Sequence, residues 1–274
     1  MSQQKVWFVT GASRGFGRLW AEGALKRGDR VVATARDIRA LDDLVAAHGE
    51  AVLPLQLDVT ERHRVFDAVA KGHSHFGRLD VVLNAAGYGY MAAIEEIDID
   101  EAKANFETNV FGTLSVIQAA LPLLRAQGTG HILTVSSIGG ILSFPTGGSY
   151  TASKFAIEAL SEALAGEVAD MGIKVTIIEP GSFATGFAAS TKTAPHMDIY
   201  DPIRAHIRAG FTPSDLGDPA ATVAAIFAAV DADAPPLRLI LGATTLPRFR
   251  AAYEARLAEW QAWSAVSVAA HGGR

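Results

Sequence analysis

The sequence predicts an α/β protein built on a doubly wound parallel β-sheet of about seven strands, with helices on both faces. Two observations favour this fold class. Short runs of apolar and β-branched residues alternate along the chain with amphipathic helical patterns, and this alternation is typical of a parallel sheet. The strand runs are also continuously apolar, as expected where a strand is buried on both faces.

The strand and helix segments follow one another in a regular order. The expected strands are Val6–Val9, Arg30–Thr34, Val52–Gln56, Val81–Leu83, His131–Val135, Lys174–Ile178 and Leu237–Leu241. The expected helices are Phe16–Arg27, Leu41–His48, Arg62–His75, Glu101–Gln127 and Ser149–Met171. Because neither a repeat nor a low-complexity linker interrupts this order, we expect residues 1–274 to form a single domain.

Composition narrows the functional classes. The chain is 49% hydrophobic and 19% charged, which describes a globular protein with an ample core. A net charge of −5 gives no basic footprint for nucleic acid or for anionic lipid. The absence of cysteine excludes disulfides, thiolate catalysis and cysteine-ligated zinc. With neither a signal peptide nor a long apolar stretch in view, a cytoplasmic protein that does not bind membranes is expected.

A glycine-rich turn near the start has the context of a dinucleotide site. Thr10-Gly11-Ala-Ser-Arg-Gly15-Phe-Gly17 follows an expected strand and opens an expected helix. Glycines allow close approach to a pyrophosphate, and the helix N-terminus favours an anion. The alternative is an ordinary glycine-rich loop. The turn lacks the Gly-Lys-Ser/Thr ending of a triphosphate-binding loop, which disfavours a kinase or an ATPase.

Tyr150 and Lys154 form the most informative pair. Residues four apart lie one turn from each other on the same helix face, and an ammonium beside a phenol lowers the pKa of that phenol. Such a tyrosine suits proton transfer to a carbonyl or from an alcohol. Ser137 lies thirteen residues before Tyr150, after the expected strand His131–Val135. With a dinucleotide as hydride source, these residues predict an oxidoreductase.

Six motifs together resemble the short-chain dehydrogenase/reductase family, in its short single-domain branch. Their order and spacing match that family over roughly residues 5–185, and the resemblance implies a Rossmann-type fold. The motifs are Thr10–Gly17, Asn84-Ala-Ala-Gly87, Asn109, Ser137, Tyr150 with Lys154, and Pro180-Gly181.

The resemblance also implies which residues hold the cofactor. Asp58 and Val59 would lie at the adenine ring, and Thr185 would hold the nicotinamide carboxamide. The segment Asn84–Gly87 has alanine where the family more often has a second asparagine. Taken alone, Asp58 is equally interpreted as a helix cap. The implied cofactor-binding residues are Gly11, Ser13, Arg14, Gly15, Phe16, Gly17, Arg36, Asp58, Val59, Asn84, Ala85, Ala86, Gly87, Tyr150, Lys154, Pro180, Gly181, Phe183 and Thr185.

The end of the second strand predicts NADP as the cofactor. In this fold an acidic residue there would bond a ribose 2′-hydroxyl, whereas an arginine suits a 2′-phosphate. Arg36 follows the strand without a preceding acid, and Arg14 in the glycine turn is a second candidate. Guanidinium groups bind phosphate through bidentate hydrogen bonds. The alternative is that both arginines are solvated, and Asp37 directly follows Arg36.

Four residues are implied to carry catalysis: Ser137, Tyr150, Lys154 and Asn109. Ser137 and Tyr150 would hydrogen-bond the substrate oxygen, Tyr150 would transfer the proton, and Lys154 would lower its pKa and bind the nicotinamide ribose. By the resemblance, Asn109 positions a water in a proton relay; the alternative is a helix-capping or kink residue. His73 and His75 are interpreted as surface residues, so no metal site is expected.

The segment at about 185–219 interrupts the strand–helix rhythm, without a clean strand, and is expected to be a substrate loop or lid. Tyr88, Phe144 and Phe187, with Phe183 and Met197, are expected to form an apolar wall for a lipophilic substrate; the alternative is core packing. A C-terminal helical tail at about 246–274 carries Trp260 and Trp263, which more often dock a tail or build a subunit contact than bind substrate.

The predicted function is an NADP(H)-dependent carbonyl reductase or alcohol dehydrogenase that interconverts a ketone or aldehyde and an alcohol on a small molecule. An NADP-binding sensor without turnover is the alternative, disfavoured by the intact Ser/Tyr/Lys set. An epimerase or dehydratase of the longer branch is disfavoured by the glycine spacing. By the resemblance, a homodimer or homotetramer is expected.

Overall fold

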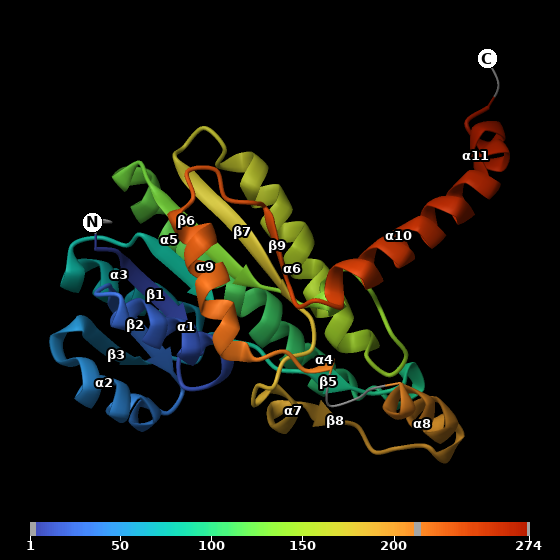
Figure 1. Ribbon diagram of the computed structural model, residues 1–274, viewed down its shortest axis with the longest axis horizontal. Helices are drawn as coiled ribbons and strands as arrows, with labels where there is room; N and C mark the ends of the chain where they lie inside the picture. Colours follow the sequence, from blue (N-terminus) through green and yellow to red (C-terminus); the bar gives the residue numbers. More distant parts are fainter. Residues whose placement is uncertain (1–3, 211–214, 273–274) are drawn as a thin grey trace.

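The computed structural model describes residues 4–210 and 215–272. Its centre is a seven-stranded sheet in the order β3-β2-β1-β4-β6-β7-β9, and every neighbouring pair is parallel (Figure 1). The strands are β1 (Val6–Thr10), β2 (Arg30–Ala35), β3 (Val52–Gln56), β4 (Val81–Asn84), β6 (Gly130–Val135), β7 (Ile173–Pro180) and β9 (Arg238–Leu241). The predicted doubly wound α/β sheet of seven strands is therefore confirmed.

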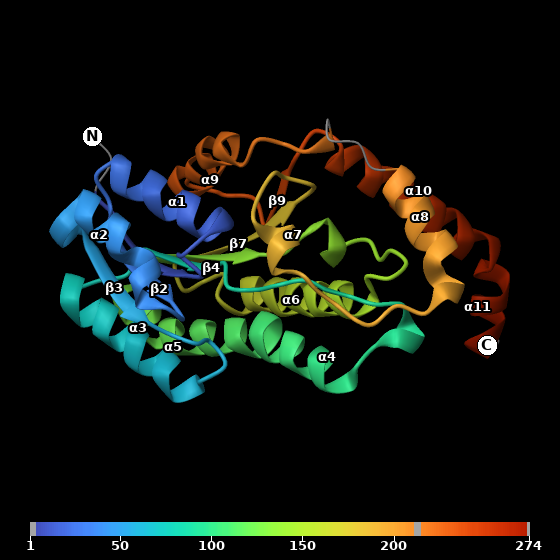
Figure 2. The same ribbon diagram turned by 90° about the horizontal axis from the view of Figure 1, so that it is seen from below.

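Helices cover both faces of the sheet, as Figure 2 shows from below. One layer contains α1 (Gly15–Lys26), α2 (Asp42–His48) and α9 (Thr222–Asp231), and the other contains α3 (Arg62–Phe76), α5 (Thr113–Gln127) and α6 (Gly148–Glu167). Short 3₁₀ turns connect several elements. They are η1 (Ile38–Leu41), η2 (Gly49–Ala51), η3 (Ile94–Glu96), η5 (Ile138–Gly140), η6 (Asp198–Tyr200) and η8 (Pro219–Ala221).

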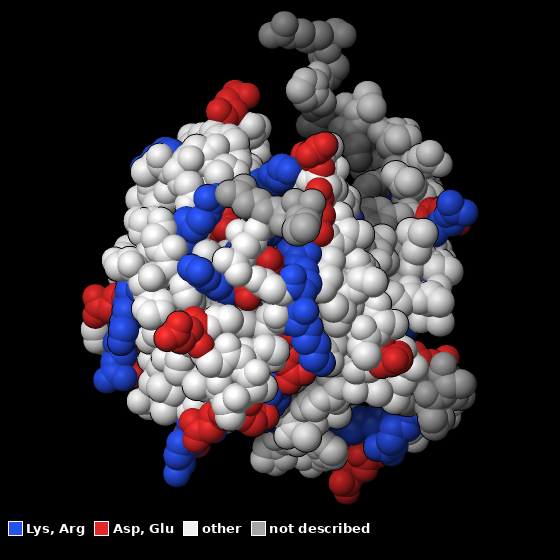
Figure 3. Space-filling view, turned by 60° about the vertical axis from the view of Figure 1, so that its left-hand side comes forward, with Lys and Arg blue, Asp and Glu red and all other residues white. Residues whose placement is uncertain are grey.

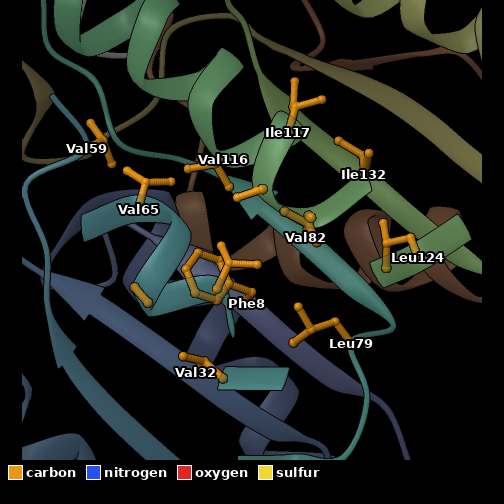
Figure 4. Packing of buried hydrophobic residues seen from close by; sticks show 14 of the residues in the cluster. Phe8, Val32, Val59, Val65, Leu79, Val82, Val116, Ile117, Leu124 and Ile132 are labelled. Carbon is orange, nitrogen blue, oxygen red and sulfur yellow. The ribbon is translucent and has the colours of Figure 1, made fainter. Parts of the chain in front are cut away.

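The core lies in two layers, one on each side of the sheet. Because side chains alternate across a strand, Phe8 of β1 faces α3 and α5, while its neighbours Trp7 and Val9 face α1. Figure 4 shows the first layer, in which Phe8 lies among strand residues and side chains of α3 and α5. Full burial of such a side chain contributes about 1.5–3 kcal/mol. The sheet is thus fixed on both faces, and its strand ends remain for other roles.

The expected helix Glu101–Gln127 is wrong as a single element. The structure has α4 (Ile99–Phe106), then a π-helical turn η4 (Glu107–Gly112), and then α5. Asn109 lies in this turn and is fully buried, and a Cβ at Gly112 would lie 2.7 Å from Val59. Such π turns are frequent at functional sites. The interruption of the helix coincides with tertiary contacts of Asn109 and Gly112, which helical periodicity does not indicate.

The segment at about 185–219 contains more regular structure than expected. It forms α7 (Phe187–Ser190), the short strand β8 (Lys192–Thr193) and α8 (Asp201–Ala209). β8 pairs in parallel with β5 (Tyr90–Met91) outside the main sheet, so the expectation of no strand is wrong. Residues 211–214 of this predicted loop lie outside the described residues. A two-residue strand carries too little periodicity to be predicted from sequence.

The C-terminal helices α10 (Thr245–Ala262) and α11 (Ser264–Ala270) extend away from the body of the domain (Figure 1). Thr245 and Phe249 anchor the start of α10 in the core, whereas Trp260 and Trp263 are exposed. Within residues 4–210 and 215–272, no helix is long and apolar enough to cross a membrane. On the face that Figure 3 shows, acidic and basic side chains are intermixed.

One buried carboxylate joins the 185–219 segment to the domain. Glu96 of η3 binds the Arg204 guanidinium of α8 through both oxygens, and it also accepts hydrogen bonds from the Met197 amide (2.7 Å) and the Ala93 amide (2.8 Å). These donors stabilise the anion, with Arg204 as the largest cause, and lower the pKa of Glu96 to about 2.

We predict that Glu96→Gln loosens α8, because the amide accepts fewer bonds and leaves Arg204 without its anion. Limited proteolysis should cut near α8 several-fold faster (about 3- to 10-fold,). Glu95→Gln, which removes the charge beside the Tyr200 hydroxyl on the surface, serves as the control. An unchanged cleavage rate in Glu96→Gln would show that the carboxylate does not hold the segment. In the wild type, this contribution is present above pH 4.5 and is lost as the pH falls towards 2, since the folded pKa is depressed.

Candidate active site

The carboxyl ends of the strands open onto one cleft with a volume of about 570 Å³. Ligands of doubly wound sheets bind at this edge. The cleft is walled by the turn after β1, the ends of β2 and β3, the loop after β4 and the loop after β7. Among the predicted cofactor-binding residues, it is lined by Gly11, Ser13, Arg14, Gly15, Arg36, Asp58, Val59, Ala85, Ala86, Gly87 and Thr185.

The other predicted cofactor-binding residues do not line the cleft. Phe16 stacks on Trp20 at 4.8 Å between ring centroids and meets the edge of Phe183 at 5.5 Å, so both phenylalanines pack on the core. The Gly181 amide bonds the Leu241 carbonyl of β9 at 2.9 Å. The residues behind the lining are Phe16, Gly17, Asn84, Tyr150, Lys154, Pro180, Gly181 and Phe183.

The glycine turn is shaped to receive a dinucleotide phosphate. Gly11 and Gly15 have φ of 68° and 60°, in the region that favours glycine. A Cβ at Gly17 would lie 2.5 Å from the Gly11 carbonyl oxygen, so only glycine allows α1 to begin this close to the turn. Arg14 precedes α1 without a side-chain cap, which leaves the first amides of the helix available to an anion.

The turn is fixed to the neighbouring strand by Thr10. Its hydroxyl oxygen accepts hydrogen bonds from the Ala85 and Ala86 amides, both at 3.1 Å. A Cβ at Gly11 would lie 3.0 Å from the Ala86 backbone, so the ends of β1 and β4 are packed closely. This contact sets the width of the cleft between the two loops.

Two arginines of the cleft are available for a phosphate. Neither Arg14 nor Arg36 pairs with a carboxylate within the described part of the chain. Asp37 instead binds Arg39 at 2.9 Å and caps η1 by accepting from the Arg39 amide at 3.1 Å. Asp37, the acid that follows Arg36, is therefore already paired with Arg39.

Asp58 both caps a turn and lines the cleft, which are the two roles that the sequence left open. Its carboxylate accepts hydrogen bonds from the Thr60 amide at 3.0 Å and the Thr60 hydroxyl at 2.8 Å, in the manner of a turn cap. Asp58, Val59 and Thr60 also line the cleft. The cap therefore fixes the loop that forms this wall.

Ser137, Tyr150 and Lys154 come together behind the lining of the cleft, and Phe187 of that lining packs on the Tyr150 ring. Ser137 caps η5 by accepting from the Gly139 amide at 3.0 Å, and it lies close enough to Tyr150 to lower the pKa of the phenol. A Cβ at Gly139 would lie 3.2 Å from the Tyr150 ring. The Lys154 Nζ lies 5.9 Å from the centroid of that ring and donates to the Val135 carbonyl at 2.9 Å. Tyr150 and Lys154 are both buried.

The expected lowering of the Tyr150 pKa by Lys154 is wrong for this conformation. Burial raises the pKa of Tyr150 to about 12, and the nearby Ser137 hydroxyl opposes this only in part. Burial also lowers the pKa of Lys154 to about 8, against the attraction of Glu158. Desolvation disfavours the charged form of each group. Tyr150 is therefore held as a neutral phenol, the form that donates a proton.

Asn109 links α6 to the loop after β4. Its amide nitrogen donates to the Tyr88 carbonyl and the Ser153 hydroxyl, both at 3.0 Å, and its oxygen accepts from the Tyr88 amide at 3.0 Å. A Cβ at Gly87 would lie 3.0 Å from the Asn109 oxygen and 3.7 Å from the Lys154 Nζ. Asn109 is thus placed near Lys154 and held by three hydrogen bonds to two residues.

The predicted apolar wall is brought together only in part. Tyr88 and Phe187 line the cleft, and the Phe187 ring lies 5.5 Å from the Tyr150 ring, between centroids. Phe144 lies over Gly147 outside this lining, and Phe183 belongs to the core. Met197 is exposed beside Glu96. Phe187 therefore covers the tyrosine, and the other three serve elsewhere.

Sequence reasoning missed several residues of the cleft. Glu107 and Thr108 line it from the π turn, and Ser190 and Lys192 line it from the segment after β7. Ser190 and Lys192 lie within the expected substrate loop at about 185–219, whereas proximity to Asn109 in the chain was the available signal for Glu107 and Thr108. Lys192 lies 5.5 Å from the Tyr88 ring centroid and pairs with Glu101 at 2.6 Å.

Relatives of known sequence match almost the whole chain. An oxidoreductase named BOA17 from Botryotinia fuckeliana is 40% identical over 272 residues, which cover 97% of this chain and 98% of that protein. A 3-ketodihydrosphingosine reductase from Bacteroides thetaiotaomicron is 36% identical over 251 residues and 88% of each chain.

Solved structures share the fold. A short-chain dehydrogenase from Streptomyces avermitilis is 40% identical, with a TM-score of 0.91 over 98% of this chain and 99% of that one. A Burkholderia phymatum short-chain dehydrogenase in complex with NAD is 24% identical, with a TM-score of 0.83 and coverages of 94% and 95%. An alcohol dehydrogenase from Thermococcus sibiricus complexed with 5-hydroxy-NADP is 25% identical, with a TM-score of 0.74 and coverages of 89% and 98%.

The family profile of the short chain dehydrogenases matches residues 5–196, which include the glycine turn, Ser137, Tyr150 and Lys154. The Burkholderia phymatum structure is in complex with NAD and the Thermococcus sibiricus structure with 5-hydroxy-NADP, and this chain has a cleft beside its glycine turn. The chain therefore belongs to the short-chain dehydrogenase/reductase family of oxidoreductases.

Proposed function

We propose that this protein is an NADP(H)-dependent carbonyl reductase or alcohol dehydrogenase for a small lipophilic substrate. The observation that carries the proposal is the buried contact of Tyr150 with Ser137 and Phe187 beside a dinucleotide-sized cleft. Two hydroxyls there converge where a carbonyl oxygen would bind, and the bound dinucleotide would supply or accept the hydride.

The side chains of this chain would perform the proton chemistry. Ser137 would hold the substrate oxygen, and Tyr150, kept neutral by burial, would donate its proton to the developing alkoxide. Lys154, close behind Tyr150 and bonded to the Val135 carbonyl, would stabilise the phenolate left after proton transfer. Asn109 would fix the loop beside Lys154 and keep the route of the returning proton in place.

Two observations support a lipophilic carbonyl substrate. Phe187 lies between the cleft and the catalytic tyrosine, so a substrate that reaches Tyr150 must replace an aromatic contact. Apolar walls with few polar groups bind apolar ligands. The name of one relative gives 3-ketodihydrosphingosine as its substrate, which is a ketone by that name.

We predict that Tyr150→Phe lowers the rate of ketone reduction about 10²- to 10⁴-fold, because the general acid is lost while the ring remains. A panel of lipophilic ketones, followed by NADPH consumption, identifies the substrate first. NADPH binding, measured by fluorescence, should stay within about twofold of the wild-type affinity (about 0.4 kcal/mol,). Full turnover by the variant would exclude the acid role of Tyr150, and no turnover with any ketone by the wild type would favour a binding protein.

For the cofactor, we predict that Arg36→Met weakens NADPH binding about 10- to 100-fold, because a charge-assisted bond to the 2′-phosphate is lost. NADH binding should not change. Arg39→Met is the matched control, since Arg39 lies three residues away and pairs with Asp37 instead of lining the cleft. Tighter binding of NADH than NADPH by the wild type would contradict the NADP preference.

A further inference from the structure

One cation of the cleft has no role in the function proposed above. Lys192 of β8 lines the cleft together with Arg14 and Arg36. Its Nζ lies 5.5 Å from the Tyr88 ring centroid and donates to a Glu101 oxygen at 2.6 Å, its one hydrogen-bond acceptor among the described residues. Because an ammonium has three N–H donors, Lys192 has donors left for a ligand of the cleft.

The backbone of Lys192 is fixed to the loop after β4. Its amide donates to the Gly89 carbonyl at 2.8 Å, next to the short pairing of β5 and β8 that sets Lys192 beside Tyr90. A Cβ at Gly89 would lie 2.7 Å from the Thr191 hydroxyl and 2.9 Å from the Phe187 ring, so the lack of a side chain there lets the segment lie this close. Main-chain contacts therefore place Lys192, and only its flexible side chain has to move to reach a ligand.

Lys192 lies between the two ends of the cleft. At one end, Phe187 of the same segment packs on the Tyr150 ring, with 5.5 Å between the centroids. At the other end, Arg36 follows β2 and is close enough to repel the Lys192 ammonium. Glu101 raises the pKa of Lys192, and this repulsion by Arg36 opposes the rise. The two cations thus face a common space in which an anion would be stabilised.

The acids of the lining do not supply that anion to Lys192. They are Asp58, which accepts hydrogen bonds from the amide and the hydroxyl of Thr60, and Glu107 of the π turn. Within residues 4–210 and 215–272, the ion pair of Lys192 is the one with Glu101, which is not part of the lining. The anion that fits this space is therefore a ligand.

The diphosphate is the part of a dinucleotide that fits the middle of the cleft. It joins the two nucleoside halves, so it would lie between a nicotinamide end at Tyr150 and a 2′-phosphate end at Arg36. The glycine turn and the N-terminus of α1 would receive it on one wall. Lys192 lines the same cleft from the segment after β7.

The ion pair with Glu101 competes only weakly with such a ligand. The side chains are 52% exposed for Lys192 and 42% for Glu101, and an exposed pair of this kind changes an equilibrium constant by no more than about fivefold. A charge-assisted hydrogen bond to a phosphate changes a binding constant by about 10- to 100-fold. The ammonium should therefore be shared with the diphosphate or transferred to it.

We propose that Lys192 is a cofactor-binding residue whose ammonium pairs with the diphosphate of the bound dinucleotide, and that Glu101 holds this ammonium when the diphosphate is absent. The proposal rests on the proposed dinucleotide cofactor, but it does not depend on the substrate or on the preference for NADP. Through Lys192, the segment that carries Phe187 is held to the cofactor.

Binding of NADH and NADPH to the full chain, measured by fluorescence without substrate, tests this assignment. We expect Lys192→Met to weaken the binding of both cofactors about tenfold or more, because a charge-assisted bond is lost. Lys192→Arg keeps the cation and should stay within about threefold of the wild-type affinity. An affinity of Lys192→Met within about twofold of the wild type would overturn the proposal.

Glu101→Gln distinguishes a ligand contact from a purely structural one. If Lys192 binds the diphosphate, removal of the competing carboxylate leaves the affinity for both cofactors unchanged or raises it, by up to about fivefold. If Lys192 serves only to fix its segment to α4, Glu101→Gln weakens binding as much as Lys192→Met does. That second outcome contradicts the proposal.

Lys103→Met is the matched control. Lys103 lies on α4, pairs with Asp100 at 3.1 Å and does not line the cleft. This variant should bind both cofactors like the wild type. A loss equal to that of Lys192→Met would show that any nearby surface cation has the same effect, and the specific contact of Lys192 would be wrong.

The two cofactors also separate the diphosphate from the 2′-phosphate. Lys192→Met should weaken NADH and NADPH binding by the same factor, whereas Arg36→Met should weaken that of NADPH alone. A loss confined to NADPH in Lys192→Met would place Lys192 at the 2′-phosphate and overturn the diphosphate assignment. Wild-type protein that binds neither dinucleotide would contradict the proposed function and this inference with it. Wild-type binding that Lys192→Met leaves unchanged contradicts the inference alone.

Discussion

A parallel sheet covered on both faces leaves only the ends of its strands for chemistry. In this protein the apolar residues of β1, β4 and β6 are buried in the two core layers. They pack against α3 and α5 on one side of the sheet and against α1 on the other. Polar side chains with a function therefore collect at the carboxyl edge, where Thr10 joins the ends of β1 and β4. The cleft, the glycine turn and the predicted catalytic residues all depend on this one constraint.

Burial then sets the chemical state of the site. Burial raises the pKa of the Tyr150 phenol and lowers the pKa of the Lys154 ammonium. In the proposed reaction, proton donation requires a neutral Tyr150, while stabilisation of the product phenolate requires a charged Lys154. The two demands conflict inside a low-dielectric interior.

Local patterns were sufficient for most of the fold and for the composition of the site. The seven strand segments were recognised because each is a short apolar run. The glycine turn and the Tyr150–Lys154 pair were recognised because their function fixes the spacing of residues in the chain. The continuous helix across Asn109 was wrong, because helical periodicity does not register a side chain that bonds another loop. The apolar wall was incomplete for a similar reason, since Phe144, Phe183 and Phe187 are alike in sequence and differ in what they contact.

By itself, the sequence determined the fold class, the family and many of the residues that line the cleft. Each of these follows from residue types at short, fixed separations. Only the tertiary structure showed that Asp37 pairs with Arg39 and that Phe187 packs on Tyr150. It also showed that Glu158 and Glu179 form a pair of acids beside Arg238. The pairing of Glu179 and Arg238 with Glu158 spans three elements, and their charges depend on desolvation. Desolvation is a property of the packed interior and has no counterpart in a local pattern of residues.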